Sequence, residues 1–302
     1  MKTYIALLAV LVAGITGCAN PDAARQVKRF SDATILTADN LTRTFRLVED
    51  NHFNEEVSVS ILDFDRRPGF EPCEIRPFMD AQAFRMRLDI LEGLKSYAAD
   101  LSAVTGDSSL AAFDQETTRL GKALNDVDTN LVSDVFFKSV PATSQDLRIF
   151  TTAINALGHR LITHRQQNEA RQAIASMQQP VADICRLLQT DLDILSQQFS
   201  NDCSQVLINK NQYVLNHLDA FNHNPGEKEA AVREMAGLAV KNRNDAAIFE
   251  SMKSAVAKLA AVNGALGEVF SNDKTNVTSL LNDLNAESER IRRYYESLSA
   301  IK

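Results

Sequence analysis

The chain has few residues that interrupt helices. Its 302 residues include only 11 glycines and 7 prolines, and there is no tryptophan. Residues that are compatible with helices, such as alanine, leucine and glutamine, are plentiful. This composition predicts an all-α protein built as a helical bundle.

The sequence also lacks the short motifs that mark common catalytic sites. It contains no H-E-x-x-H, no G-x-S-x-G and no glycine-rich phosphate loop. The pairs His159/His164 and His217/His223 are five and six residues apart, a spacing that does not place two imidazoles on one helix face. We therefore expect no enzymatic activity, no metal site and no cofactor.

An excess of basic charge is missing as well. The formal net charge is -7, and without the first 17 residues, which carry Lys2 and no acid, it is one unit more negative. Acidic residues lie close to the few short basic clusters. Nucleic acid is therefore excluded as a partner, because its binding depends on clustered positive charge.

The first 17 residues have the organisation of a signal peptide. Lys2 precedes an apolar run from Ile5 to Ile15, which is too short to span a bilayer permanently. The run ends in Ile15-Thr16-Gly17-Cys18, with small residues directly before a cysteine. No other apolar run approaches the roughly 20 residues of a membrane-spanning helix.

This tetrapeptide resembles the lipobox of bacterial lipoproteins. The resemblance implies that Cys18 is lipid-modified, with palmitate among the expected acyl chains, and becomes the first residue of the mature protein. It also implies attachment to a membrane through the lipid on Cys18, on the periplasmic side of the cell envelope. Ala19 and Asn20, rather than aspartate, follow the cysteine, and this favours the outer membrane.

Three further cysteines are expected to lie in an oxidising compartment, where disulfides persist. Cys185 and Cys203 fall in one predicted helix and are 18 residues apart, or about 27 Å at 1.5 Å per residue, which is too far for a bridge. The predicted disulfide therefore joins Cys73 to Cys185 or to Cys203. The alternative is that all three thiols are free and buried.

The N-terminal part, residues 18–140, is expected to contain helices over 21–50, 80–104 and 108–136. Residues 51–78 are expected to form an irregular insertion, because Arg67-Pro68-Gly69 and Glu71-Pro72 interrupt regular structure. Val57, Val59 and Ile61 alternate with polar residues and predict a short strand there. The phenylalanines at 53, 64, 70 and 78 suggest that the insertion packs onto the body, and Phe70 and Phe136-Phe137 are candidates for an exposed apolar patch.

Residues 141–302 carry an apolar seam with a seven-residue repeat. It runs from Met235 through Phe249 to Ile301, and a matching seam runs from Val181 to Tyr213. The turn signal Asn222-His223-Asn224-Pro225-Gly226 lies between them. We expect a long antiparallel, coiled-coil-like hairpin with its turn near 222–227, either as a straight rod or folded back at polar breaks such as Ser271-Asn272-Asp273.

Together these features favour a lipid-anchored envelope protein that acts as a structural or partner-binding module, with a protein partner of unknown identity. A membrane-active helical bundle of the pore-forming type is one alternative. An enzyme whose site is assembled from distant helices is another.

Overall fold

The computed structural model describes residues 21–64, 75–79, 81–105, 170–270 and 275–299. Every regular element in these ranges is helical, which confirms the predicted all-α class. The α-helices are α2 (Pro21–Phe64), α3 (Ala81–Thr105), α7 (Ala170–Asn216), α8 (Leu218–His223), α9 (Pro225–Ala265) and α10 (Thr275–Ser299), and the short 3₁₀ helix η3 (Leu266–Phe270) follows α9.

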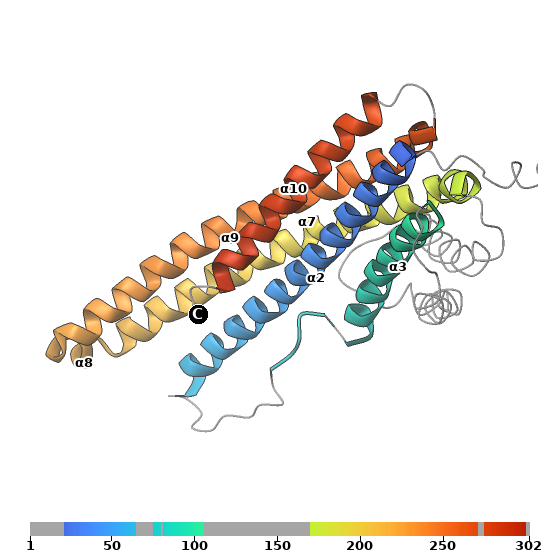
Figure 1. Ribbon diagram of the computed structural model, residues 1–302. Coiled ribbons are helices and arrows are strands. Elements are labelled where there is room, and N and C mark those ends of the chain that lie inside the picture. Colours follow the sequence, from blue (N-terminus) through green and yellow to red (C-terminus); the bar gives the residue numbers. More distant parts are fainter. Residues whose placement is uncertain (1–20, 65–74, 80, 106–169, 271–274, 300–302) are drawn as a thin grey trace, which may run out of the picture.

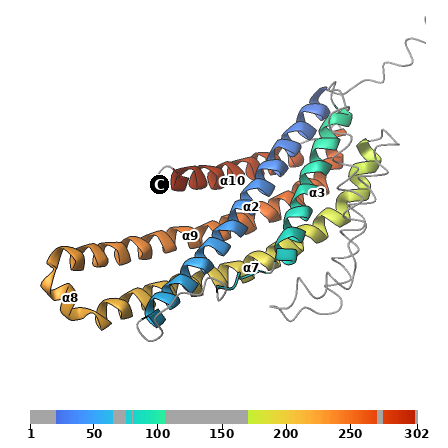
Figure 2. The same cartoon turned by 90° about the horizontal axis from the view of Figure 1, so that it is seen from below.

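The helices form one elongated bundle (Figures 1 and 2). α7 and α9 pack along each other as the two arms of an antiparallel hairpin, and α8 lies at its tip. α2 packs against both α3 and α7. After η3 the chain reverses, so that α10 packs back along α9 and α2. The predicted hairpin is therefore folded back into a bundle at its C-terminal end, and α9 does not continue into α10.

The predicted seams supply much of the core. In α7 the seam residues from Val181 to Asn209 are buried, and the helix continues through Pro180 without interruption. In α9 the seam is buried from Asp245 to Asn263, and its next position, Leu266 at the start of η3, is buried as well. Phe199 and Phe249 meet where the two arms pack, with ring centroids 5.4 Å apart.

The predicted strand at 57–61 and the start of the irregular insertion at 51 are wrong, because α2 continues to Phe64. Extending a formed helix needs no new nucleus, so the small helix-propensity cost of valine and isoleucine does not end it. Ser58 and Ser60 donate side-chain hydrogen bonds to the carbonyls of Glu55 and Glu56, in place of any strand pairing. Phe53 and Phe64 are exposed on this helix rather than packed onto the body.

The two ends of the bundle differ in burial. No residue from 210 to 244 is buried, although this range includes the end of α7, all of α8 and about half of α9. The turn lies where the sequence predicts it, because Asn224 caps α9 by accepting a hydrogen bond from the Glu227 amide at 3.4 Å, and Pro225 follows as the first helical residue. The hairpin tip therefore extends beyond the packed body.

Several predicted features fall outside the described residues. These are the leader with Cys18, the segment with Phe70 and Cys73, the predicted helix at 108–136, Phe136-Phe137, and the pair His159/His164. The boundary at 140/141 also falls there. The lipidation of Cys18 and the disulfide of Cys73 stay predictions.

Candidate functional site

The candidate site is the end of the bundle that carries the hairpin tip, and we call it the distal end. It comprises residues 51–64 of α2, 203–216 of α7, all of α8, and residues 225–244 of α9. Every exposed large hydrophobic side chain among the described residues lies on it. These side chains are Phe53, Val59, Ile61, Phe64, Ile208, Tyr213, Leu215, Leu218, Val232 and Val240.

The exposure at the distal end has a simple structural origin. In the body, α10 and α3 cover faces of α2, α7 and α9, so the helices bury their apolar positions. At the tip, the two arms are the only long helices among the described residues, and each buries at most one face. Val240, for example, is 59% exposed, although it lies on the same helix, α9, as the fully buried Phe249. Large clustered apolar surface on a folded protein commonly marks an interaction site.

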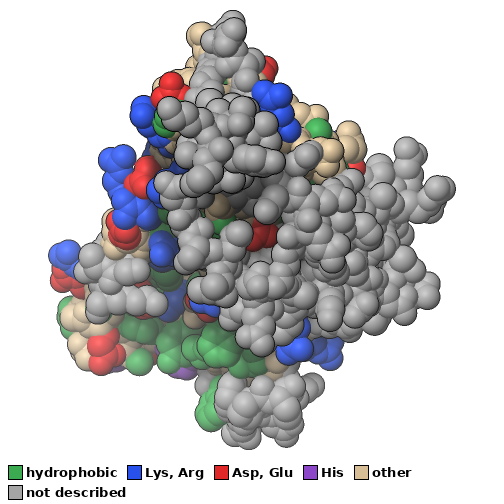
Figure 3. Space-filling view, turned by 45° about the vertical axis from the view of Figure 1, so that its right-hand side comes forward, with side chains coloured by type: hydrophobic (Ala, Val, Ile, Leu, Met, Phe, Trp, Pro, Cys, Tyr) green, Lys and Arg blue, Asp and Glu red, His purple; other side chains and the backbone are tan. Residues whose placement is uncertain are grey.

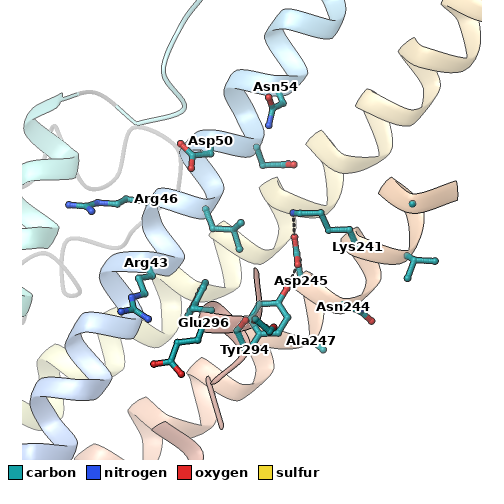
Figure 4. A pocket seen from close by; sticks show the side chains of 16 residues that line it. Arg43, Arg46, Asp50, Asn54, Lys241, Asn244, Asp245, Ala247, Tyr294 and Glu296 are labelled. Carbon is teal, nitrogen blue, oxygen red and sulfur yellow. Dashed lines mark hydrogen bonds and ion pairs between the residues drawn. The ribbon is translucent and has the colours of Figure 1, made fainter. Parts of the chain in front are cut away.

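An open groove of about 1290 Å³ adjoins the distal end, where α10 ends beside α2 and α9 (Figure 4). Arg43, Arg46, Asp50 and Asn54 come from α2, and Lys241, Asn244 and Asp245 from α9, while α10 supplies Tyr294 and Glu296.

At the floor of this groove Asp245 is fully buried. It accepts hydrogen bonds from the Tyr294 hydroxyl and the Lys241 ammonium. Burial raises the pKa of Asp245, and Lys241 opposes that rise. The carboxylate joins α9 to α10 through this network.

Beside the groove, α2 and α7 share a half-buried ionisable cluster. The His52 imidazole Nδ1 lies 3.2 Å from a carboxylate oxygen of Asp202, and its Nε2 lies 3.9 Å from Glu56. One ligand atom each of His52, Glu55 and Asp202 lies within 4.8 Å of the other two. Imidazole and carboxylate groups at such separations are able to hold a metal ion.

Neither cysteine in the described part of the protein is activated as a nucleophile. Cys185 and Cys203 are both buried, and burial raises the pKa of each thiol to about 12. The Cys203 thiol donates a hydrogen bond to Asn51 Oδ1 at 3.4 Å. A nucleophilic cysteine needs a lowered pKa, so these two thiols are suited to packing.

The body contains a buried ion pair that links α3 to α7. Arg87 donates from Nε and Nη2 to the two oxygens of Asp191, both at 2.8 Å, and the side chains are 8% and 10% exposed. Paired hydrogen bonds of this kind fix geometry. The pair aligns α3 on the bundle, and the groove and the His52 cluster lie elsewhere.

A stripe of small polar side chains joins α2 to α10. Thr37 shares a hydrogen bond with Ser288 at 2.8 Å, Thr44 shares one with Tyr295 at 2.7 Å, and Asn40 Nδ2 donates to the Ser288 carbonyl at 2.9 Å. Such bonds specify one register between two helices. Asn263 acts similarly in the core, because it accepts from the Tyr97 hydroxyl and donates to the Met177 carbonyl.

Two histidines named from the sequence and four polar residues at seam positions have local partners. His217 and His223 lie at the tip, and each points a ring nitrogen at a backbone carbonyl four residues earlier, at 2.9 and 2.6 Å. Of the four polar seam residues, Asp245 and Asn263 are fully buried, Glu287 is nearly so, and Asn242 is half-buried. Their polar atoms find partners inside the bundle.

Sequence reasoning missed the His52 cluster for an identifiable reason. His52, Glu55 and Glu56 have the i, i+3, i+4 spacing that puts side chains on one helix face. That signal has meaning only on a helix, and residues 51–78 are expected from the sequence to be irregular. Asp202 lies 150 residues further along the chain, and only the fold reveals that it completes the cluster.

The described helices define an elongated all-α bundle with an open groove and an apolar distal end. No known protein family matches the chain, and comparisons with curated proteins and with solved structures likewise found no match. Among the described helices, none has both the length and the apolar character needed to cross a membrane.

Proposed function

We propose that the chain is a lipid-anchored module of the bacterial cell envelope that binds a protein partner through its distal end. In this proposal Cys18 carries the lipid and holds the protein on the periplasmic side of the outer membrane. The helices act by shape and surface rather than by catalysis. The partner is another envelope protein.

The observation that carries the proposal is the separation of the two ends. α2 begins at Pro21, three residues after Cys18, and its N-terminus lies at the end of the bundle opposite α8 (Figure 1). At 1.5 Å per residue, its 44 residues extend over about 65 Å. A membrane-attached Cys18 would therefore leave the exposed apolar side chains far from the point of attachment.

The surface chemistry at the tip favours a protein as the occupant. Apolar side chains such as Val232 are interspersed with exposed ion pairs, for example Arg233 with Glu229 and Lys210 with Glu234, both at 2.6 Å. Mixed apolar and paired-charge surface is typical of protein interfaces, whereas anionic lipid or nucleic acid requires unpaired basic charge. Figure 3 turns the opposite end of the bundle forward, and on that face Lys and Arg lie mainly along the left edge, while apolar side chains gather in the lower part.

Site-specific photo-crosslinking in living cells tests this proposal. A crosslinker at Val232 should capture one defined envelope protein, and a crosslinker at the exposed Arg186 in the body should not. The double variant Val232→Ser/Val240→Ser should then lose the same product when the probe is at Leu218. Equal capture from position 186, or an unchanged product in the double variant, would contradict the proposal.

A further inference from the structure

We propose that His52, Glu55 and Asp202 form a site for a divalent transition-metal ion of the zinc type, which fastens α2 to the root of the hairpin. This inference concerns the stability of the distal end and does not rest on the identity of a partner. It differs from the expectation, drawn from the sequence, that the chain has no metal site.

The donor set suits zinc in number and kind. The imidazole of His52 and the carboxylates of Glu55 and Asp202 supply three ligand atoms that all lie within 4.8 Å of one another. Glu56 lies 3.9 Å from the other ring nitrogen, Nε2, so it falls outside this set, and water would complete a zinc site with three protein ligands. One imidazole with carboxylates is a set that zinc accepts, whereas calcium and magnesium sites are built from oxygen alone.

The ligands come from two helices that pack in register. His52 and Glu55 lie one turn apart on α2, and Asp202 faces them from α7. The imidazole of His52 packs edge-on against Phe78, with ring centroids 5.9 Å apart. Gln198 donates to the other Asp202 oxygen at 2.7 Å, which orients that carboxylate toward His52. Outer hydrogen bonds of this kind are what hold metal ligands in place.

The charges around the cluster are unbalanced without a cation. Among the described residues no lysine or arginine forms an ion pair with Glu55, Glu56 or Asp202, so three carboxylates share one imidazole. Burial raises the pKa of Glu55, and the charges of Asp202 and Glu56 raise it further. Burial likewise raises the pKa of Asp202, and the Glu56 charge adds to that rise. The side chains of His52 and Asp202 are only 14% and 6% exposed, so solvent relieves this repulsion incompletely. A divalent cation would remove it.

The position of the cluster explains what the metal would do. Asp202 lies on α7 shortly before Asn209, the last buried residue of that arm. Beyond this point the hairpin leaves the body, and α2 contacts it through polar bonds such as Asn209 Nδ2 to Ser58 Oγ at 2.8 Å. A metal at His52 would hold the two helices together where core packing ends.

Zinc binding to the full-length protein in detergent tests the site. Metal-free protein titrated with zinc sulfate in a calorimeter should bind one equivalent tightly, and saturating zinc should raise the melting temperature, because a ligand of the folded state alone stabilises it. The variants His52→Gln and Asp202→Asn should each weaken that event at least tenfold and lose the increase in melting temperature. Both replacements keep the size and hydrogen-bonding capacity of the side chain, and a circular dichroism spectrum verifies that the helices are retained.

The matched control is His217→Ala/His223→Ala, which removes the two histidines at the tip and should leave the zinc affinity unchanged. Undiminished affinity in both His52→Gln and Asp202→Asn would overturn the proposal, as would the absence of any zinc binding at micromolar concentration. Calcium that binds as tightly as zinc, with an affinity that His52→Gln does not change, would also overturn it, because the imidazole would then not be a ligand.

Discussion

The body and the hairpin tip, residues 210–244, are built mainly from the same two long helices, α7 and α9, yet the body has a core and the tip has no buried residue. α7 buries nearly every seam position up to Asn209 and none after it, and α9 has no buried residue before Asp245. The seam itself continues across both limits. The difference teaches that burial of a helix face is decided by the helices packed against it, here α2, α3 and α10.

The sharpest test of this contrast compares one core residue with one tip residue on α9. Phe249→Ala should lower the free energy of unfolding by about 3–5 kcal/mol, the usual cost of removing a buried phenylalanine. Val232→Ala should change it by less than about 0.5 kcal/mol, because the side chain is 53% exposed. Urea unfolding followed by circular dichroism measures both. Similar losses for the two variants would mean that the tip is packed in solution.

The buried ion pair of the body should be the next most sensitive feature. Arg87→Met leaves Asp191 as an uncompensated buried charge, and breaking such a pair costs about 3 kcal/mol. Arg87→Met/Asp191→Leu removes both charges and should recover most of that loss. The exposed tip pair is the matched control, because Arg233→Met should cost less than about 1 kcal/mol. Urea unfolding checks all three variants, and no recovery in the double variant would contradict the interpretation.

Amide hydrogen exchange should show the same contrast without any substitution. We expect the amides of residues 210–244 to open with free energies at least about 2 kcal/mol below those of residues 248–263, because exposed helical turns open locally. Mass-spectrometric exchange at one pH measures both ranges in one experiment. Equal protection across α9 would mean that the tip is as stable as the body.

The hairpin could be predicted from the sequence, but the contrast in burial along it could not, and the reason is physical. Heptad spacing predicts both hairpin arms, and the turn at Asn224 and Pro225 follows from local backbone chemistry. Neither signal says how far α10 reaches along α9. The seam near Met235 and Leu238 therefore looks the same as the seam near Phe249, although the first two residues are only half-buried and the third is fully buried.

The candidate sites depend even more on tertiary packing. The alternation at Val57, Val59 and Ile61 predicts a strand, whereas α2 continues through these residues. Because the sequence predicts no helix there, the i, i+3 spacing of His52 and Glu55 gives no signal. Asp202 is a polar residue in an apolar seam, and the sequence alone does not say what it faces. The groove combines three helices whose pairing no local pattern encodes.

The smallest expected effect concerns Glu55, at the boundary between the two regions. Its pKa is raised by burial and by Asp202 and Glu56, so the folded protein binds the Glu55 proton more tightly than the unfolded chain does. The stability that Glu55 contributes relative to a neutral glutamine therefore falls as pH rises through the interval between the two pKa values. In a chelator, Glu55→Gln should be more stable than the parent at pH 7, by less than about 1 kcal/mol because the group is partly solvated.

That advantage of Glu55→Gln should vanish near pH 4, where the parent carboxyl gains its proton, and it should reverse in zinc at pH 7, where the parent alone keeps all three ligands. Urea unfolding at both pH values, with chelator and with zinc, separates the contributions. An advantage that is equal at pH 4 and pH 7 would show that charge repulsion is not its source. If zinc did not reverse the order, Glu55 would not be a ligand, and the contact between α2 and the hairpin root would depend on hydrogen bonds such as that of Asn209 with Ser58.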